Sequence, residues 1–492
     1  MADLSHLHLN PESDVPLYKQ LAESIVNTIA RGDLRPADRL PATRELAGQL
    51  GLNRTTVSAA YALLEETGFI EGHVGRGSFV AKREKTPAPS ATDWDAILPP
   101  LEAPLPPVHK IEISFANSRP AAEEFPLAEF RRLSKQVIDS PEATQILQLG
   151  SPHGYPPLRR YLLEQALAKG VARPGDDLIV TNGCQQAFDL LAHLFASGGQ
   201  SAVLEDPVYH GLVRVFSRAG AHIVPVPVDG NGLDVDALET AMERHRPRLI
   251  VVTPSFQNPT GATLSFDRRK RLVEIARRSG AVLVENDIYS ELRYRGKPLP
   301  PLKELDETGN TILLRSYSKV AFPGLRVGWI IAPRAVVARL AEAKQTSDLH
   351  SDQLAQAILL RFAESGELAL HLERTRRAGA ERLQAVLRGC AQYLPPGTRF
   401  TRPEGGMSLW IELPAPLTAE GLLARAEERG VSFLAGRHFS ADHRHIRGLR
   451  ISFGALAPAR ILRGLQMIGE AVEAELAASR APERFEAIAA LV

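Results

Sequence analysis

Residues 316–329 read SYSKVAFPGLRVGW, and this stretch does most to decide the fold of the chain. It joins two apolar runs, TILLRSYS and RVGWIIAP, and places Lys319 between Ser316 and Arg326. A lysine amine can form a Schiff base with an aldehyde cofactor, and a nearby hydroxyl and guanidinium can bind a phosphate on that cofactor. A lone lysine is usually a solvated surface charge, so the hypothesis depends on the motifs around this stretch.

Short apolar runs alternate with helix-length amphipathic segments on either side of it. Several runs are apolar almost throughout, as are strands buried on both faces of a parallel sheet. This alternation predicts an α/β sheet with helices on both faces. After about residue 346 the pattern becomes helical and then mixed, which indicates a smaller C-terminal domain. The apolar runs are DLIVT (177–181), SAVLED (201–206), RLIVVTP (248–254), AVLVEND (281–287), TILLRSYS (311–318) and RVGWIIAP (326–333).

Three further motifs carry residues that suit a phosphorylated pyridine aldehyde. In VENDIYSELRY, Asp287 follows a predicted strand, where an aspartate can keep a pyridine nitrogen protonated. Tyr289, and Asn258 in PSFQNPTG, can bond a ring phenolate. In TNGCQQAFDL, Gly183 stands between a strand and a helix, where free amides suit a phosphate. Singly, each motif has a simpler explanation as a helix cap or a turn.

Together, in this chain order, the four motifs resemble those of the fold type I pyridoxal 5′-phosphate (PLP) aminotransferases over roughly residues 111–475. The resemblance implies that Lys319 binds PLP covalently, that Asp287 pairs with the pyridinium, and that Asn258 and Tyr289 contact the ring O3′.

The same resemblance implies the remaining contacts of the cofactor and of its ligand. It places Tyr209, in EDPVYHG, against the ring, and Arg450, in LRISFG, on a substrate or effector carboxylate. The phosphate site it implies consists of Ser316, Arg326 and the amides of Gly183, Cys184 and Gln185.

Some positions depart from this pattern or call for a different explanation. Leu149 stands where many relatives have a tyrosine that reaches the neighbouring subunit's phosphate, and Cys184 stands where serine or threonine is common. Both changes are expected to weaken cofactor retention without altering the lysine chemistry. The histidines of GRHFSADHRHIRG (436–448) lack a Cys or acidic framework, so no metal site is predicted. The basic clusters RHRPR (244–248) and DRRKR (267–271) are interpreted as solvated helix faces.

The N-terminal part, residues 12–81, is predicted to form three helices and a short hairpin. Apolar residues recur at helical spacing from Leu17 to Ile29. A short helix over about 43–50 is followed by a glycine turn, and a second helix begins after Asn53, which suits an N-cap. In a helix-turn-helix, the first residues of the second helix enter the major groove.

The residues at the start of that second helix are Arg54, Thr55 and Thr56. Arginine can fork onto guanine, and threonine offers a hydroxyl and a methyl group. The following FIEGHVGRGSFVA predicts two strands and a glycine turn, in which Arg76 suits a wing contact. However, residues 1–81 hold seven Lys and Arg against ten Asp and Glu, whereas a basic patch is the usual footprint. A helical subdomain with no DNA role is therefore the alternative.

The run from Pro16 to Val80 resembles the GntR-family winged helix-turn-helix over its whole length, through its helix order, the LPxxRxLA core and the GxG wing. Ala42 departs from the pattern, since the family usually has a serine there that caps the helix. The resemblance implies DNA contacts by Arg44, Arg54, Thr55, Thr56 and Arg76.

Composition bounds the remaining possibilities. The 492 residues are too many for one core, and the 58 Lys and Arg balance 57 Asp and Glu, so the whole-chain charge excludes no partner. Two cysteines and the lack of an apolar run of about 20 residues fit the bacterial cytoplasm. Residues 82–110 hold seven prolines; because proline fixes φ and lacks an amide donor, we expect an extended linker with no helix.

The expected architecture is a winged helix-turn-helix (12–81), a linker (82–110) and an aminotransferase-like domain (111–480). The last comprises a large α/β domain over about 140–345 and a small α+β domain over about 346–480. This order resembles the MocR subgroup of GntR regulators, which implies a homodimer with sites at the subunit interface. It predicts a cytoplasmic transcription factor that binds double-stranded DNA and senses an amino compound, or PLP itself. An active aminotransferase, for example of the aminoadipate type, is the competing hypothesis, because every group for the first half-reaction is present.

Overall fold

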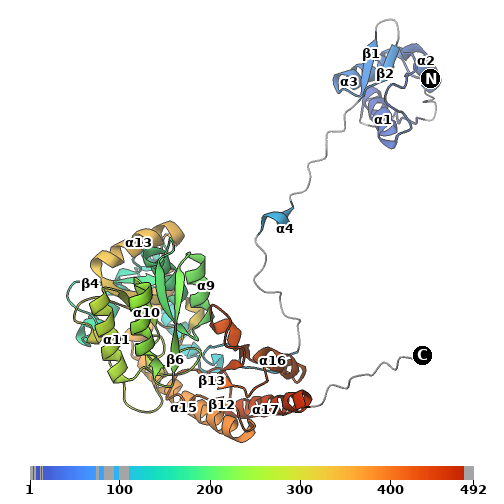
Figure 1. The fold of residues 1–492 in the computed structure, drawn as a ribbon. Coiled ribbons are helices and arrows are strands. Elements are labelled where there is room, and N and C mark those ends of the chain that lie inside the picture. Colours follow the sequence, from blue (N-terminus) through green and yellow to red (C-terminus); the bar gives the residue numbers. More distant parts are fainter. Residues whose placement is uncertain are drawn as a thin grey trace, which may run out of the picture. The chain divides into compact units, whose positions relative to one another are not determined.

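The computed structural model describes residues 4, 7–11, 13, 15–73, 77–82, 93–98 and 110–480. The chain divides into two compact units, residues 1–106 and 107–492, and each is considered by itself (Figure 1). Arg76 and most of the proline-rich stretch lie outside the described residues, so the predictions for them stay predictions.

The first unit has the predicted order of three helices and a hairpin. Its helices bury one apolar side each: Leu21 and Ile25 from the first, and Val57 from the third, have no exposed surface. Strands β1 and β2 pair antiparallel, from Ile70 opposite Val80. The elements are α1 (Leu17–Arg31), α2 (Thr43–Leu50), α3 (Arg54–Glu66), β1 (Ile70–His73) and β2 (Gly77–Val80).

A one-turn helix, α4 (Trp94–Ile97), lies in the stretch that was expected to hold no helix. That expectation was wrong for this segment. The seven prolines lie at or before residue 89 and from residue 99 onward, so the intervening residues keep their amide donors.

The second unit is built on an eight-stranded sheet in the order β4-β11-β10-β9-β8-β5-β6-β7. All six apolar runs form strands, and the sheet is largely parallel from β10 to β6, as predicted. Strand β11 runs antiparallel to both β10 and β4. The strands are β4 (Asp176–Thr181), β5 (Ser201–Asp206), β6 (His222–Asp229), β7 (Gly232–Leu233), β8 (Leu249–Val252), β9 (Val282–Asn286), β10 (Thr311–Ser316) and β11 (Gly328–Pro333).

Both faces of this sheet are buried. Consecutive side chains of a strand point to opposite faces, and here they enter different cores: Leu178 and Val180 pack in one core, and Ile179 packs in another. Helices α10, α11 and α13 lie along the sheet (Figure 1). The helices of this part are α5 (Leu127–Ile138), α6 (Ala143–Ile146), α7 (Pro156–Ala168), α8 (Cys184–Phe195), α9 (His210–Arg218), α10 (Val235–His245), α11 (Phe266–Ser279), α12 (Leu302–Leu305), α13 (Arg334–Asp348) and α14 (Gln353–Glu364), with short 3₁₀ helices η1 (Ala122–Glu124), η2 (Ser290–Leu292) and η3 (Pro323–Leu325).

A smaller α+β part follows, built on the four-stranded sheet β12-β13-β16-β15. Helices α15 and α17 pack side by side against its core (Figure 1). The parallel pair of β14 and β3 brings the start of the second unit into this part. Its elements are β3 (Ile113–Ser114), α15 (Glu367–Tyr393), β12 (Arg399–Phe400), β13 (Ser408–Glu412), α16 (Ala419–Glu428), β14 (Val431–Ser432), β15 (Leu434–Ala435), η4 (Gly436–Phe439), β16 (Gly448–Ser452) and α17 (Pro458–Arg480).

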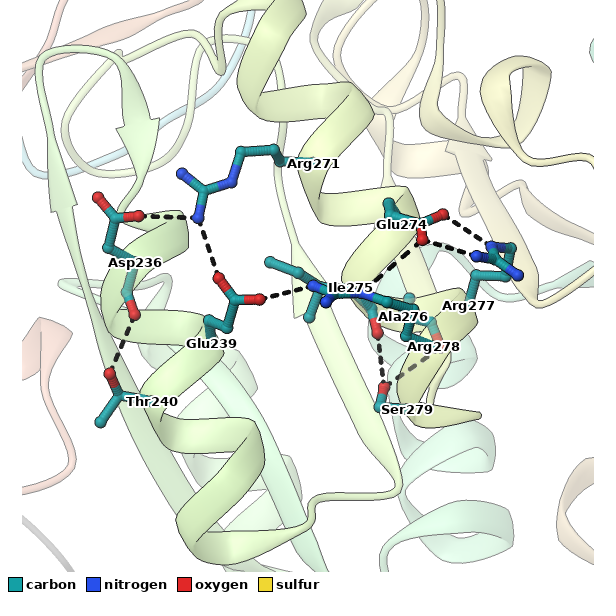
Figure 2. Close-up of polar contacts among 10 residues, drawn as sticks. All are labelled: Asp236, Glu239, Thr240, Arg271, Glu274, Ile275, Ala276, Arg277, Arg278 and Ser279. Carbon is teal, nitrogen blue, oxygen red and sulfur yellow. Dashed lines mark hydrogen bonds and ion pairs between the residues drawn. The ribbon is translucent and has the colours of Figure 1, made fainter.

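The basic cluster at 267–271 lies on α11 beside the acidic side chains of α10 (Figure 2). Arg271 contacts Asp236 at 2.8 Å and Glu239 at 3.1 Å, and Arg278 contacts Glu239 at 2.6 Å. These side chains are partly exposed, so each pair contributes little to stability. The interpretation of this cluster as a solvated helix face is correct for the exposed Lys270 and Arg271. It is wrong for Arg269, which is 1% exposed and whose guanidinium donates hydrogen bonds to three backbone carbonyl oxygens.

Among the helices of the described residues, none combines the length and the apolar character needed to cross a bilayer.

Candidate functional site

A cavity of about 270 Å³ lies where strands β8, β9 and β10 reach their carboxyl ends, the edge at which open α/β sheets commonly bind ligands. Most of the predicted cofactor and effector residues line it. They are Cys184, Gln185, Tyr209, Asn258, Tyr289, Ser316, Lys319, Arg326 and Arg450.

Lys319 enters this cavity from the connection between β10 and β11. Its Nζ donates a hydrogen bond to the carbonyl oxygen of Ser118 at 2.6 Å and lies 5.9 Å from the centroid of the Tyr289 ring. The amine is therefore held inside the cavity, where a bound aldehyde can reach it.

The predicted phosphate end is formed by the start of α8 and by Arg326. Gly183 precedes α8 with φ of 77°, and a Cβ atom there would lie 2.5 Å from Arg326 Nη2, so only glycine fits. Arg326 Nη2 donates to the carbonyl oxygen of Asn182 at 3.3 Å. Ser316 Oγ donates to the carbonyl oxygen of Val327 at 3.0 Å.

Ser318 and Cys184 line the same cavity as Arg326. The hydroxyl of Ser318 lies 3.5 Å from Arg326 Nη1; the sequence motif contained this residue, but no role was predicted for it. Burial raises the pKa of the Cys184 thiol to about 12, so this side chain stays protonated. It therefore offers only a weak S–H donor at the start of α8.

Arg450, in the middle of β16, is almost fully buried and lines the cavity. Its Nη1 donates to Asn258 Oδ1 at 3.0 Å, its Nη2 donates to the carbonyl oxygen of Ala116, and its Nε has no partner. Burial lowers the pKa of the guanidinium to about 10, so Arg450 stays charged at neutral pH. Among the described residues, no aspartate or glutamate pairs with it.

The aromatic wall consists of Tyr209 and His210 at the start of α9, with ring centroids 4.8 Å apart. Burial raises the pKa of Tyr209. Burial, reinforced by Arg450, lowers the pKa of His210 to about 4, so the imidazole is neutral at pH 7.

Asp287 was predicted to pair with the pyridinium of the cofactor, but its side chain does not line the first cavity. Its Oδ2 accepts hydrogen bonds from Arg315 Nε at 2.9 Å and Nη2 at 2.7 Å. Both residues line a second cavity together with Tyr161 and Trp329. The residue before it, Asn286, lines the first cavity instead.

The pairing of Asp287 with Arg315 yields a prediction about stability. We expect Asp287→Asn to lower the free energy of unfolding by about 3 kcal/mol, because it leaves a largely buried guanidinium without its counter-charge. Denaturant unfolding measures the change, with Asp189→Asn on the surface as the control. A loss as small as that of the control would contradict the assigned ion pair.

The charge balance of the first cavity is one-sided. Its lining includes the cations Lys319, Arg326 and Arg450, and no aspartate or glutamate of the described residues lines it. Four buried polar atoms on its wall lack hydrogen-bond partners: Ser118 Oγ, His210 Nδ1, Asn286 Oδ1 and Arg450 Nε. Buried polar atoms are normally satisfied, so the cavity fits a polar, anionic ligand such as PLP together with an acid.

The candidate DNA-contacting residues lie on α2 and α3 of the first unit. Arg44, Arg54 and Thr55 are exposed, and Thr56 is partly exposed. Asn53 caps α3 as predicted: its Oδ1 accepts from the Thr55 amide at 3.1 Å and from the Thr55 hydroxyl at 2.9 Å. The Thr55 hydroxyl is therefore engaged in the cap, which leaves its methyl group for a base contact.

Two of the departures noted in the sequence are visible in the structure. Ala42 precedes α2 without a side-chain cap. Leu149 is 77% exposed and lies away from the cavity lining. Two histidines of residues 436–448 have partners of their own: His445 pairs with Asp206 at 3.0 Å, and His443 contacts the backbone carbonyl oxygen of Arg437.

The fold and the cavity define a PLP-binding protein of the aminotransferase fold, joined to a winged helix-turn-helix. Residues 121–468 match the family of class I and II aminotransferases, and residues 17–80 match the gntR family of bacterial regulatory proteins. The chain therefore belongs to the aminotransferase class I and II family and carries a gntR-family DNA-binding module. PLP is the cofactor of this domain.

Similar proteins fall into two groups. The probable rhizopine catabolism regulatory protein MocR of Rhizobium meliloti is 31% identical over 484 residues, covering 94% of this chain and 95% of the relative. The 2-aminoadipate transaminase of Thermus thermophilus is 39% identical over 368 residues, covering 74% of this chain and 91% of the enzyme. The structure of LysN, the α-aminoadipate aminotransferase of T. thermophilus, has a TM-score of 0.71 and 38% identity, covering 75% of this chain and 94% of that one. The relative that is similar over nearly its whole length is thus named as a probable regulatory protein, and this chain combines a gntR-family module with an aminotransferase domain.

Proposed function

We propose that the chain is a transcriptional regulator in which an acidic amino compound, bound at the PLP site, changes the affinity of the winged helix-turn-helix for double-stranded DNA. The observation that carries this proposal is a cavity whose lining, among the described residues, holds three cationic side chains and no acid, in a chain that also carries a DNA-binding module. Such a protein acts on bacterial DNA, and we therefore place it in the cytoplasm.

Some residues of the cavity are suited to bind the cofactor, and one is suited to bind the effector. PLP supplies an aldehyde that condenses with primary amines and a ring that withdraws electrons. Arg326 and the start of α8 are suited to hold its phosphate, and Lys319 to hold its aldehyde. Arg450 is then left with a buried positive charge, which an acidic group of the effector can pair with.

The effector must also carry a primary amine, because only an amine can take the place of Lys319 Nζ on the aldehyde. DNA affinity changes only if the effector binds the two states of the protein unequally. A MocR-type arrangement further implies a homodimer, and the exposed Leu147 and Leu149 support a subunit contact.

We expect Arg450→Ala to abolish the response to acidic amines while PLP remains attached. Titration with amino acids, ω-amino acids and aminosulfonates, followed through the absorbance of the bound cofactor, measures the response. Arg447→Ala is the matched control. Arg447 directly precedes β16, and its side chain pairs with Glu412 outside the cavity. An equal response to neutral amines, or control of DNA binding by PLP alone, would contradict the acidic-amine proposal.

An active aminotransferase is the second candidate, favoured by the position of Lys319 in the cavity and by the similarity to the T. thermophilus transaminase. Two assays separate the candidates. A regulator binds DNA upstream of its own gene, whereas an enzyme exchanges an amino donor with a 2-oxo acid over many turnovers.

A further inference from the structure

A pair of polar side chains, Asn286 and Thr253, lies at the carboxyl ends of β9 and β8 and lines the PLP cavity. Asn286 Nδ2 donates to Thr253 Oγ1 at 3.0 Å. Asn286 is 5% exposed, and its Oδ1 is a buried acceptor without a partner. An unsatisfied buried amide oxygen in a ligand cavity indicates that the ligand meets this amide.

The covalent structure of PLP indicates which atom of the cofactor meets the Asn286 amide. On the ring, the nitrogen lies opposite the carbon that bears the aldehyde, and the phosphate arm and O3′ flank that carbon. Lys319 marks the aldehyde, Arg326 the phosphate and Asn258 the O3′ in the proposed function, on which this inference rests. These assignments give partners to the aldehyde, the phosphate and O3′, but none to the ring nitrogen. The Thr253–Asn286 pair is the polar group at the strand ends that has no assigned atom, so we assign it to the ring nitrogen.

We propose that the neutral amide of Asn286, rather than a carboxylate, faces the ring nitrogen of PLP and leaves that nitrogen unprotonated. This assigns the ring contact to the residue next to Asp287. Consecutive residues at the end of a strand point to opposite sides, and Asp287 lies on the side of Arg315.

Among the residues that the structure describes, no other acid supplies a negative charge at this point. Glu205 accepts from the amide of Thr253 at 3.1 Å, and Glu285 accepts from the amides of Leu302 and Lys303 at 2.9 Å. Burial raises the pKa of Glu205 to about 8; burial and the charge of Asp287 raise that of Glu285 to about 7. Neither lines the cavity. A pyridinium there would be a buried cation without a counter-charge, which desolvation disfavours.

The Asn286 amide can serve an unprotonated nitrogen directly. In the structure Nδ2 donates to Thr253 Oγ1, but the two ends of an amide are assigned from its hydrogen bonds, and the Thr253 hydroxyl can donate as well as accept. With the amide rotated by 180°, Oδ1 accepts from Thr253 and Nδ2 faces the ring nitrogen. A neutral ring nitrogen withdraws fewer electrons, and loss of the Cα proton from a bound amino compound is slowed. The domain then retains its effector instead of converting it, which suits a sensor.

The test is ¹⁵N NMR of the full-length protein reconstituted with PLP labelled at the ring nitrogen. We expect the wild type to give the resonance of an unprotonated pyridine at neutral pH, and Asn286→Asp to move it to that of a pyridinium. Thr253 Oγ1 can donate to the new carboxylate, so the fold is retained. Asp287→Asn is the matched control, studied at a temperature where it is folded, and it should leave the wild-type resonance unchanged.

A second variant does not depend on the new carboxylate. Asn286→Leu removes the donor, and PLP should bind about fivefold more weakly in equilibrium dialysis, the effect of one lost hydrogen bond. A pyridinium resonance in the wild type, or a shift caused by Asp287→Asn and absent in Asn286→Asp, would overturn the assignment. If PLP fails to attach to Lys319 at all, the proposed function fails as well, and the two failures are thereby distinguished.

Discussion

Lys319→Ala is expected to abolish covalent attachment of PLP and to leave the fold intact. Lys319 is the only lysine among the described residues of the cavity wall, and its single hydrogen bond there is to the carbonyl of Ser118. After reduction with borohydride, mass spectrometry of peptides should find the phosphopyridoxyl group on Lys319 in the wild type and nowhere in the variant.

Lys270→Ala is the matched control for this experiment, because Lys270 lies on the exposed side of α11 above the ring of Phe266. That variant should carry the adduct as the wild type does. Absence of a reducible adduct at Lys319 in wild-type protein supplied with PLP would refute the cofactor site at this residue.

Arg54→Ala, combined with Arg76→Ala, is expected to weaken binding to DNA upstream of the gene without changing the spectrum of bound PLP. Arg54 is exposed at the start of α3. If it reads a base, its loss should cost about 1–3 kcal/mol and relax specificity at that base, whereas a lost phosphate contact should mainly reduce the salt dependence by about one unit.

Fluorescence anisotropy at fixed salt measures this affinity, and repetition at several salt concentrations gives the slope. Arg31→Ala is the control within the same unit, since Arg31 lies in the last turn of α1 and has no assigned DNA contact. Unchanged affinity in the double variant would contradict the assignment of α3 to the major groove.

The sequence predicted the strands of the large sheet and nine of the 18 residues that line the cavity, because most of the motifs follow the carboxyl ends of strands that a parallel sheet brings together. Lys319 and Asn258 meet in this way. Arg450 reaches Asn258 from the middle of β16 in the other sheet, 192 residues further along the chain. The segment around Ser118 was not predicted, since no local pattern shows that it reaches Lys319 from the pairing of β3 with β14.

The sequence also could not show which of two adjacent residues, Asn286 or Asp287, lines the cavity. Asn286 and Asp287 both follow an apolar run, and an aspartate is the more obvious partner for a pyridine. What decides their directions is Arg315, at the end of β10, which binds Asp287 on the far side. The winged helix-turn-helix was more predictable, because its caps, such as Asn53 on Thr55, are local in the chain.

The most direct test of the central claim is the DNA affinity of the PLP-loaded protein, measured at fixed salt with and without an acidic primary amine. A ligand shifts this affinity only through its unequal binding to the two states. We expect the dissociation constant for the upstream DNA to change with the amine in the wild type and to stay constant in Arg450→Ala. A dissociation constant that no amine changes in the wild type, with PLP attached to Lys319, would contradict the account.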